Sequence, residues 1–75
     1  LVRAIQYILG ELLITYGIMN GSVPPEQTGI YDTATENLVK NFQLQNGIDA
    51  TGNTDKTTWD RLVTLFEKMV SEYDQ

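Results

Sequence analysis

The sequence predicts an all-α fold, a small three-helix bundle with two glycine-containing loop-to-helix repeats. In three segments, apolar residues recur at spacings of three, four and seven, which places them on one face of a helix. The segments between them are rich in glycine, proline and asparagine, which favour turns. We expect helices over about residues 2–16, 33–46 and 56–73. Because an amphipathic helix cannot bury its apolar face alone, the three should pack together in a single domain over residues 1–75.

The first predicted helix has a continuous apolar face and ends before a glycine. Gly17 can adopt the left-handed conformation that commonly ends helices. Residues 17–31 are expected to form a loop, since the pair Pro24-Pro25 prevents helix and favours extended chain. The apolar residues of this loop should hold it on the core: Ile18, Val23 and Ile30. The apolar face of the helix consists of Val2, Ile5, Leu9, Leu12, Leu13 and Tyr16.

The second and third predicted helices each begin after an aspartate. Asp32 and Asp55 can accept hydrogen bonds from backbone amides that the first helical turn leaves unpaired. The dipeptide Asn46-Gly47 favours a left-handed end for the second helix. The apolar face of the second helix consists of Leu38, Val39 and Phe42. That of the third consists of Trp59, Leu62, Val63, Phe66, Met69 or Val70, and Tyr73.

An internal repeat covers the entries into these two helices. Four residues recur at an offset of 23: Gly29, Asp32, Thr35 and Val39 return as Gly52, Asp55, Thr58 and Leu62. In each copy the glycine permits a turn, the aspartate caps the helix, and the threonine falls at the third helical position. Gln6 and Gln43 lie beside apolar faces, and we expect each to be a buried amide that bonds to loop backbone. This repeat accounts for the fold without any ligand.

The composition argues against several classes of function. The chain contains no cysteine and no histidine, so it lacks thiol chemistry, the commonest general base and the usual zinc ligands. A net charge of −5 argues against nucleic acid and anionic membranes as partners. No stretch reaches the roughly 18 apolar residues of a membrane span. We therefore expect no catalytic residue, no metal and no cofactor.

Two acidic patterns resemble reactive or metal sites without completing them. Asp32, Asp49 and Asp55 could supply paired carboxylates for glycoside hydrolysis, but two of them are helix caps and the domain is too small for a deep cleft. The alternating oxygen ligands of Asp49-x-Thr51-x-Asn53-x-Asp55 are typical of a calcium loop. The central glycine and the final glutamate of such a loop are missing from their places.

The residues of the repeat belong to three longer motifs. They are Val2-x-x-Ile5-Gln6-x-x-Leu9, then Gly29-x-Tyr31-Asp32-x-x-Thr35-x-x-x-Val39-x-x-Phe42-Gln43, then Gly47-Ile48 with Gly52-x-x-Asp55-x-x-Thr58-Trp59-x-x-Leu62. In this order and spacing they resemble the peptidoglycan-binding repeat of bacterial cell-wall hydrolases, over nearly the whole chain. Asp32 and Asp55 stand where that family has a second glycine, and Tyr31 stands where it usually has phenylalanine. The aspartates keep the capping and change the surface chemistry of the loops.

The resemblance implies a non-catalytic module that targets an attached hydrolase to the cell wall or spore cortex. Its ligand would be the glycan or the stem peptide of peptidoglycan, and it would act outside the cell as a monomer. Val23-Pro24-Pro25 resembles the low-GC Gram-positive type of the family. The chain starts at Leu1, without methionine, so we expect it to be a piece of a longer protein with a catalytic domain. The alternative is a protein-interaction domain, or a structural spacer or prodomain, without glycan binding.

The best candidate surface is the pair of loops with the first turns of the helices that follow. Amides at helix N-termini attract carboxylates, which stem peptides carry, although the two capping aspartates oppose one there. We expect a shallow groove lined by Tyr31, Asn53, Thr54 and Thr57 that hydrogen-bonds the stem peptide or the sugar. The candidate ligand-binding residues are Tyr31, Asp32, Thr35, Asn53, Thr54, Asp55 and Thr57. The structural motif consists of Gly29, Phe42, Gln43, Gly52, Thr58, Trp59 and Leu62.

The only tryptophan has two possible roles. An exposed aromatic face can serve as a platform for a sugar ring. Trp59 begins the apolar face of the third helix, however, and this position favours core packing, as it does for Phe66.

Overall fold

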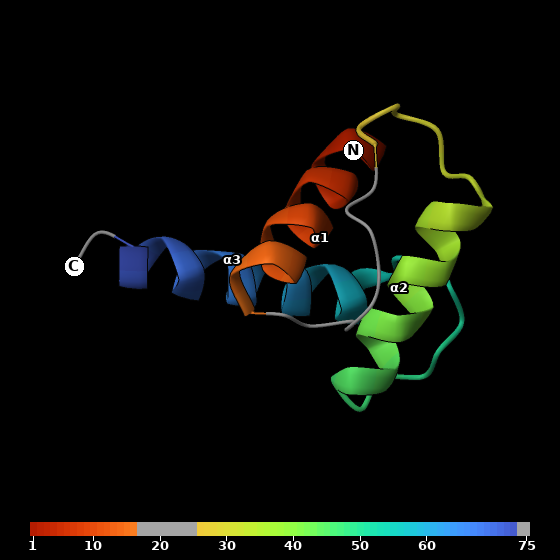
Figure 1. The fold of residues 1–75 in the computed structure, drawn as a ribbon. Coiled ribbons are helices and arrows are strands. Elements are labelled where there is room, and N and C mark those ends of the chain that lie inside the picture. Colours follow the sequence, from red (N-terminus) through yellow and green to blue (C-terminus); the bar gives the residue numbers. More distant parts are fainter. Residues whose placement is uncertain (17–25, 74–75) are drawn as a thin grey trace.

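The computed structural model describes residues 1–16 and 26–73, and these residues form an all-α domain of three helices (Figure 1). The helices are α1 (Val2–Tyr16), α2 (Thr33–Gln45) and α3 (Lys56–Tyr73). The predicted three-helix fold is confirmed, and α2 ends one residue before the predicted boundary. The helix-ending role of Gly17 and the expectations for Ile18 and the proline pair lie outside the described residues.

The core forms where α1 lies across the first half of α3 and beside α2 (Figure 1). α1 supplies five of its nine buried apolar side chains, so it is the central helix of the bundle. Burying one large aliphatic side chain contributes about 1.5–3 kcal/mol, so these nine residues dominate the stability of so small a domain. The buried apolar residues are Ile5, Ile8, Leu9, Leu12, Leu13, Leu38, Val39, Phe42 and Leu62.

The apolar face of α3 is more exposed than its pattern predicts. Leu62 is fully buried, but Phe66 and Trp59 are only half-buried and pack against the edge of the core. Tyr73 is 89% exposed. The core position predicted for Phe66 is confirmed in part, since Phe66, like Trp59, packs against the core without being fully buried. The Phe66 ring packs edge-to-face on Tyr7 of α1, with 6.0 Å between the centroids.

The end of α2 follows the predicted glycine-dependent geometry. Gly47 has a φ of 69°, the left-handed conformation that costs an L side chain energy. The backbone N–H of Ile48 donates to the carbonyl of Gln43 at 2.9 Å, and that of Gly47 donates to the carbonyl of Leu44 at 3.4 Å. These two bonds make a Schellman motif, which satisfies carbonyls that the helix end would leave unpaired. The chain is thereby redirected toward the start of α3.

The loop before α2 departs from expectation at one residue. Ile30 is 67% exposed, so it does not hold the loop on the core as its apolar side chain suggested. The backbone of Ile30 holds the loop instead, because its carbonyl accepts a hydrogen bond from the buried side chain of Gln6. Polar contacts therefore fix this loop.

Candidate functional site

One buried glutamine holds the loop that enters α2. Gln6 projects from α1 and is 1% exposed. Its Nε2 donates to the carbonyl of Ile30 and to Oγ1 of Thr35, both at 3.0 Å. Its Oε1 accepts from Gly29 N–H, also at 3.0 Å. We call this arrangement the first glutamine bridge; it joins α1, the loop and the first turn of α2 through a single carboxamide.

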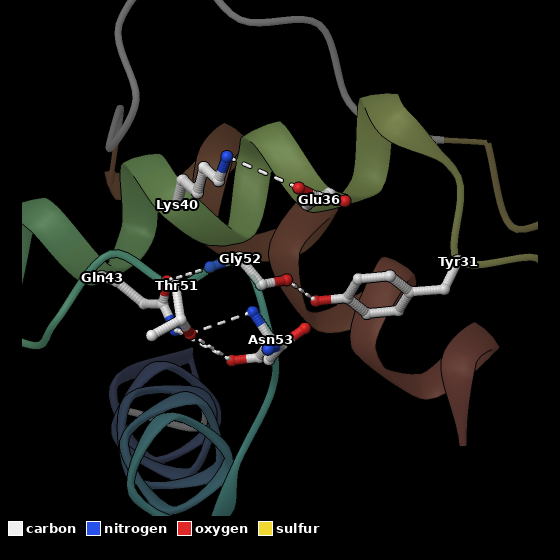
Figure 2. Close-up of polar contacts among 7 residues, drawn as sticks. All are labelled: Tyr31, Glu36, Lys40, Gln43, Thr51, Gly52 and Asn53. Carbon is white, nitrogen blue, oxygen red and sulfur yellow. Dashed lines mark hydrogen bonds and ion pairs between the residues drawn. The ribbon is translucent and has the colours of Figure 1, made fainter.

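A second buried glutamine does the same for the loop that enters α3 (Figure 2). Gln43 of α2 is fully buried, and its Nε2 donates to the carbonyl of Asn53 at 2.9 Å and to Oγ1 of Thr58 at 3.0 Å. Its Oε1 accepts from Gly52 N–H at 2.9 Å. This is the second glutamine bridge. The predicted role of both glutamines, a buried amide that ties a helix to a loop, is confirmed.

The glycine in each loop is required by its backbone conformation. Gly29 and Gly52 have φ values of 81° and 80°, where any L side chain is strained. At Gly52 an added Cβ would also lie 2.6 Å from Cγ of Glu36 and 3.0 Å from Cε of Lys40. These two side chains form a 3.4 Å ion pair on the surface of α2, directly over the loop (Figure 2). The loop backbone therefore passes close beneath α2.

The two predicted aspartate caps are present with matching geometry. Oδ1 of Asp32 accepts from Thr35 N–H, and Oδ1 of Asp55 accepts from Thr58 N–H, each at 2.9 Å. The backbone amide of Thr35, with a further contribution from its hydroxyl, lowers the pKa of Asp32. The corresponding groups of Thr58 lower the pKa of Asp55. Each carboxylate thus occupies the place at the helix N-terminus where an anionic ligand would otherwise bind.

Tyr31 connects the two loops. Its hydroxyl donates to the carbonyl of Gly52 at 2.5 Å (Figure 2). The same hydroxyl lies 3.1 Å from Oγ1 of Thr54. Burial raises the pKa of the Tyr31 hydroxyl above its ordinary value, so the group remains a donor at neutral pH. The loop before α2 is therefore fixed to the loop before α3 by a side chain that phenylalanine could not replace.

Two depressions flank the start of α3. The first, of about 310 Å³, lies between the beginnings of α1 and α3 and is lined by Leu1, Ile5, Thr54, Asp55, Lys56 and Trp59. The second, of about 320 Å³, is lined by Ile48, Thr57, Asp60, Arg61 and Thr64. Thr54 and Thr57 thus lie in separate depressions, and neither depression is lined by Tyr31 or Asn53. The single groove expected from the sequence is replaced by two shallow hollows.

Two candidate residues have different surroundings from those expected. Thr35 is 1% exposed and its hydroxyl is bonded to Gln6, so it has no surface to offer a ligand. Trp59 packs on the core, as predicted, but it also lines the first depression. Its spacing on the helix could not reveal this second contact, because the depression depends on where α1 lies.

The described parts of the chain do not assemble a metal or membrane site. Residues 1–16 and 26–73 contain no group of three acidic side chains that could hold a metal ion. In the same ranges, no helix combines the length and the hydropathy that crossing a bilayer requires.

Comparison with known families assigns this arrangement to a class. Residues 1–62 match a family model described as "Putative peptidoglycan binding domain". Because the match covers most of the 75 residues, the chain belongs to this family of binding domains. The assignment suggests peptidoglycan as the partner, association with the cell wall and a non-catalytic role. No curated protein and no solved structure matches the chain.

The second glutamine bridge predicts a large effect from a small truncation. Gln43→Ala should lower the free energy of unfolding by about 3 kcal/mol, because it leaves the buried N–H of Gly52 and the hydroxyl of Thr58 without their partner. Gln45→Ala, on the exposed side of the same helix, should change it by less than about 0.5 kcal/mol. Urea denaturation measures both. Equal midpoints for the two variants would contradict a structural role for the Gln43 carboxamide.

The aspartate caps predict a specific dependence of stability on pH. Both carboxyl groups have a lower pKa in the folded chain than their ordinary value of 3.8. Their contribution is therefore complete above about pH 4 and is lost as pH falls through the lowered folded-state pKa. Asparagine also caps helices but does not titrate in this range, so a double variant, Asp32→Asn with Asp55→Asn, should lose less stability between pH 4 and 2. Thermal unfolding across this range tests it; parallel declines in the two proteins would show that the caps are not responsible.

Proposed function

We propose that this domain binds peptidoglycan and holds an attached hydrolase on the cell wall or spore cortex. Membership of the peptidoglycan binding domain family over residues 1–62 carries this proposal. A module of this kind adds no chemistry of its own. It raises the local concentration of a catalytic domain on an insoluble polymer, so even a weak site becomes effective once it is tethered or repeated. The parent protein would be exported by a low-GC Gram-positive bacterium, and the domain would act as a monomer.

The proposed contact surface is the region around the start of α3. The two glutamine bridges and the Tyr31 bond fix the loop backbones, so little conformational entropy remains to be lost when a ligand binds. Thr54 and Thr57 offer hydroxyl groups in the two depressions, and Asn53, the residue before Thr54, offers an exposed carboxamide. Asp32 and Asp55 contribute by ordering the helix starts. Such a shallow polar surface suits a repeating polymer better than a small diffusing substrate.

A second candidate function, protein interaction, is favoured by a different surface. An open groove of about 560 Å³ lies between α1 and the second half of α3, and its floor is largely apolar. It is lined by Tyr7, Glu11, Thr15, Phe66, Met69, Val70, Glu72 and Tyr73. Five of these residues follow Leu62, where the family match ends. A domain that packs on its own enzyme as a spacer or prodomain would use a surface of this kind.

Sedimentation with purified peptidoglycan sacculi separates the two functions. We expect the isolated domain to appear in the pellet with sacculi and to stay in the supernatant with cellulose particles, which share the insolubility and lack the N-acetyl groups and the stem peptides. Saturation with increasing protein would give the affinity. A domain that remains in the supernatant in every case would contradict the proposal and favour the protein-interaction function.

A further inference from the structure

The single tryptophan lies at the boundary between the core and the first depression. Trp59 is half-buried at the start of α3, where its backbone N–H donates to the carbonyl of Asp55 at 2.8 Å. Trp59 packs against the core and also lines the depression of about 310 Å³. Its indole Nε1 makes no hydrogen bond to any residue in 1–16 or 26–73, and no buried side-chain nitrogen there lacks a partner.

The lining of this depression has the two-sided character of a sugar site. Its apolar part is formed by Trp59 with Leu1 and Ile5, and its polar part by the residues Thr54, Asp55 and Lys56. A volume of about 310 Å³ falls at the lower end of the range for small-molecule sites, enough for a single ring. A pyranose ring has an apolar C–H face that packs on an aromatic ring and hydroxyl groups that point outward to polar partners.

The charges around the depression favour a neutral ligand over an acidic one. Lys56 is the only basic side chain in the lining, and its Nζ is already 2.7 Å from Oδ2 of Asp60. The carboxylate of Asp55 caps α3 and lies in the same lining. A stem peptide, which is rich in carboxylates, would therefore meet a negative charge and a cation that is already paired. A sugar of the glycan strand meets neither difficulty.

The hydrogen bonds of Tyr31 and the second glutamine bridge hold the polar part of the depression in place. Oγ1 of Thr54 lies 3.1 Å from the hydroxyl of Tyr31, which also bonds the carbonyl of Gly52. Gln43 fixes the carbonyl of Asn53, the residue before Thr54. Ile5, on the apolar side, is buried next to Gln6 in α1. The two sides of the depression thus have a fixed separation before any ligand arrives, which lowers the cost of binding.

We propose that this depression is a subsite for one N-acetylhexosamine ring of the glycan strand, with Trp59 as the platform for the ring. The hydroxyl of Thr54 and the indole N–H supply the polar contacts, and the exposed side chain of Leu1 supplies an apolar surface for the N-acetyl methyl group. This inference rests on the proposed function and deepens it by naming the glycan, rather than the stem peptide, as the part of peptidoglycan that the domain recognises.

Because Trp59 is the only tryptophan, its fluorescence and its indole N–H resonance can be followed without a contribution from another tryptophan. We expect glycan strands freed of their peptides, and soluble N-acetylglucosamine oligomers, to shift both signals in a saturable manner. Amidase-released stem peptides and glucose oligomers should leave them unchanged. A response to stripped glycan strands without one to N-acetylglucosamine oligomers would assign the subsite to the muramic acid residues of peptidoglycan, which still supports the proposal. A response to stem peptides instead of glycans would overturn it.

A pair of aromatic-to-leucine variants tests the same subsite on whole sacculi. Trp59→Leu should weaken binding about ten-fold, since it removes the ring platform. Tyr73→Leu removes an exposed aromatic ring at the far end of α3 and should bind like the wild type. Circular dichroism checks folding, and Trp59→Phe, which keeps more of the core packing, should bind with intermediate strength. If the wild type binds sacculi and all three variants bind equally, the subsite is wrong although the function stands; if the wild type does not bind, the proposed function itself fails.

Discussion

Two buried carboxamides determine how this small domain is organised. A buried amide that lacks partners costs more than it contributes, so Gln6 and Gln43 stabilise the fold only if their donors and acceptors all find partners. Each finds them in the same three places: a glycine N–H, a loop carbonyl and a threonine hydroxyl. The chain therefore has one construction used twice. A helix side chain fixes the following loop and the first turn of the next helix, in a domain with little apolar core to spare.

The candidate surface depends on this construction. With the loop carbonyls fixed by the glutamines, the ring of Tyr31 can span from one loop to the other and bond Gly52. That bond in turn sets the place of Thr54, opposite the apolar residues at the start of α1. Trp59 contributes to both regions, since it packs against the core and also lines the depression. Stability and the proposed recognition are thus linked through a few shared residues.

The sequence predicts the repeated parts of this fold well because they depend on local physics. Helix periodicity, an aspartate cap and a positive-φ glycine act within a few residues of one another, so their spacing of 23 is visible in the sequence. The glutamines are separated by 37 residues (43 − 6) and not by 23, so the repeat does not reveal that they belong to it. The burial of Thr35 depends on Gln6, which lies 29 residues earlier. The partial exposure of Phe66 and the depression beside Trp59 depend on how α1 lies against α3, which no local pattern records.

Hydrogen exchange of the loop amides tests the central claim most directly. If the carboxamides hold the loops, the amide protons of Gly29 and Gly52 should exchange as slowly as those of the surrounding helices, because only the glutamine side chains accept them. The neighbouring amides of Ile30 and Asn53 donate to exposed threonine hydroxyls and should exchange much faster. Equally fast exchange of all four protons, in a chain whose helices remain protected, would contradict the account.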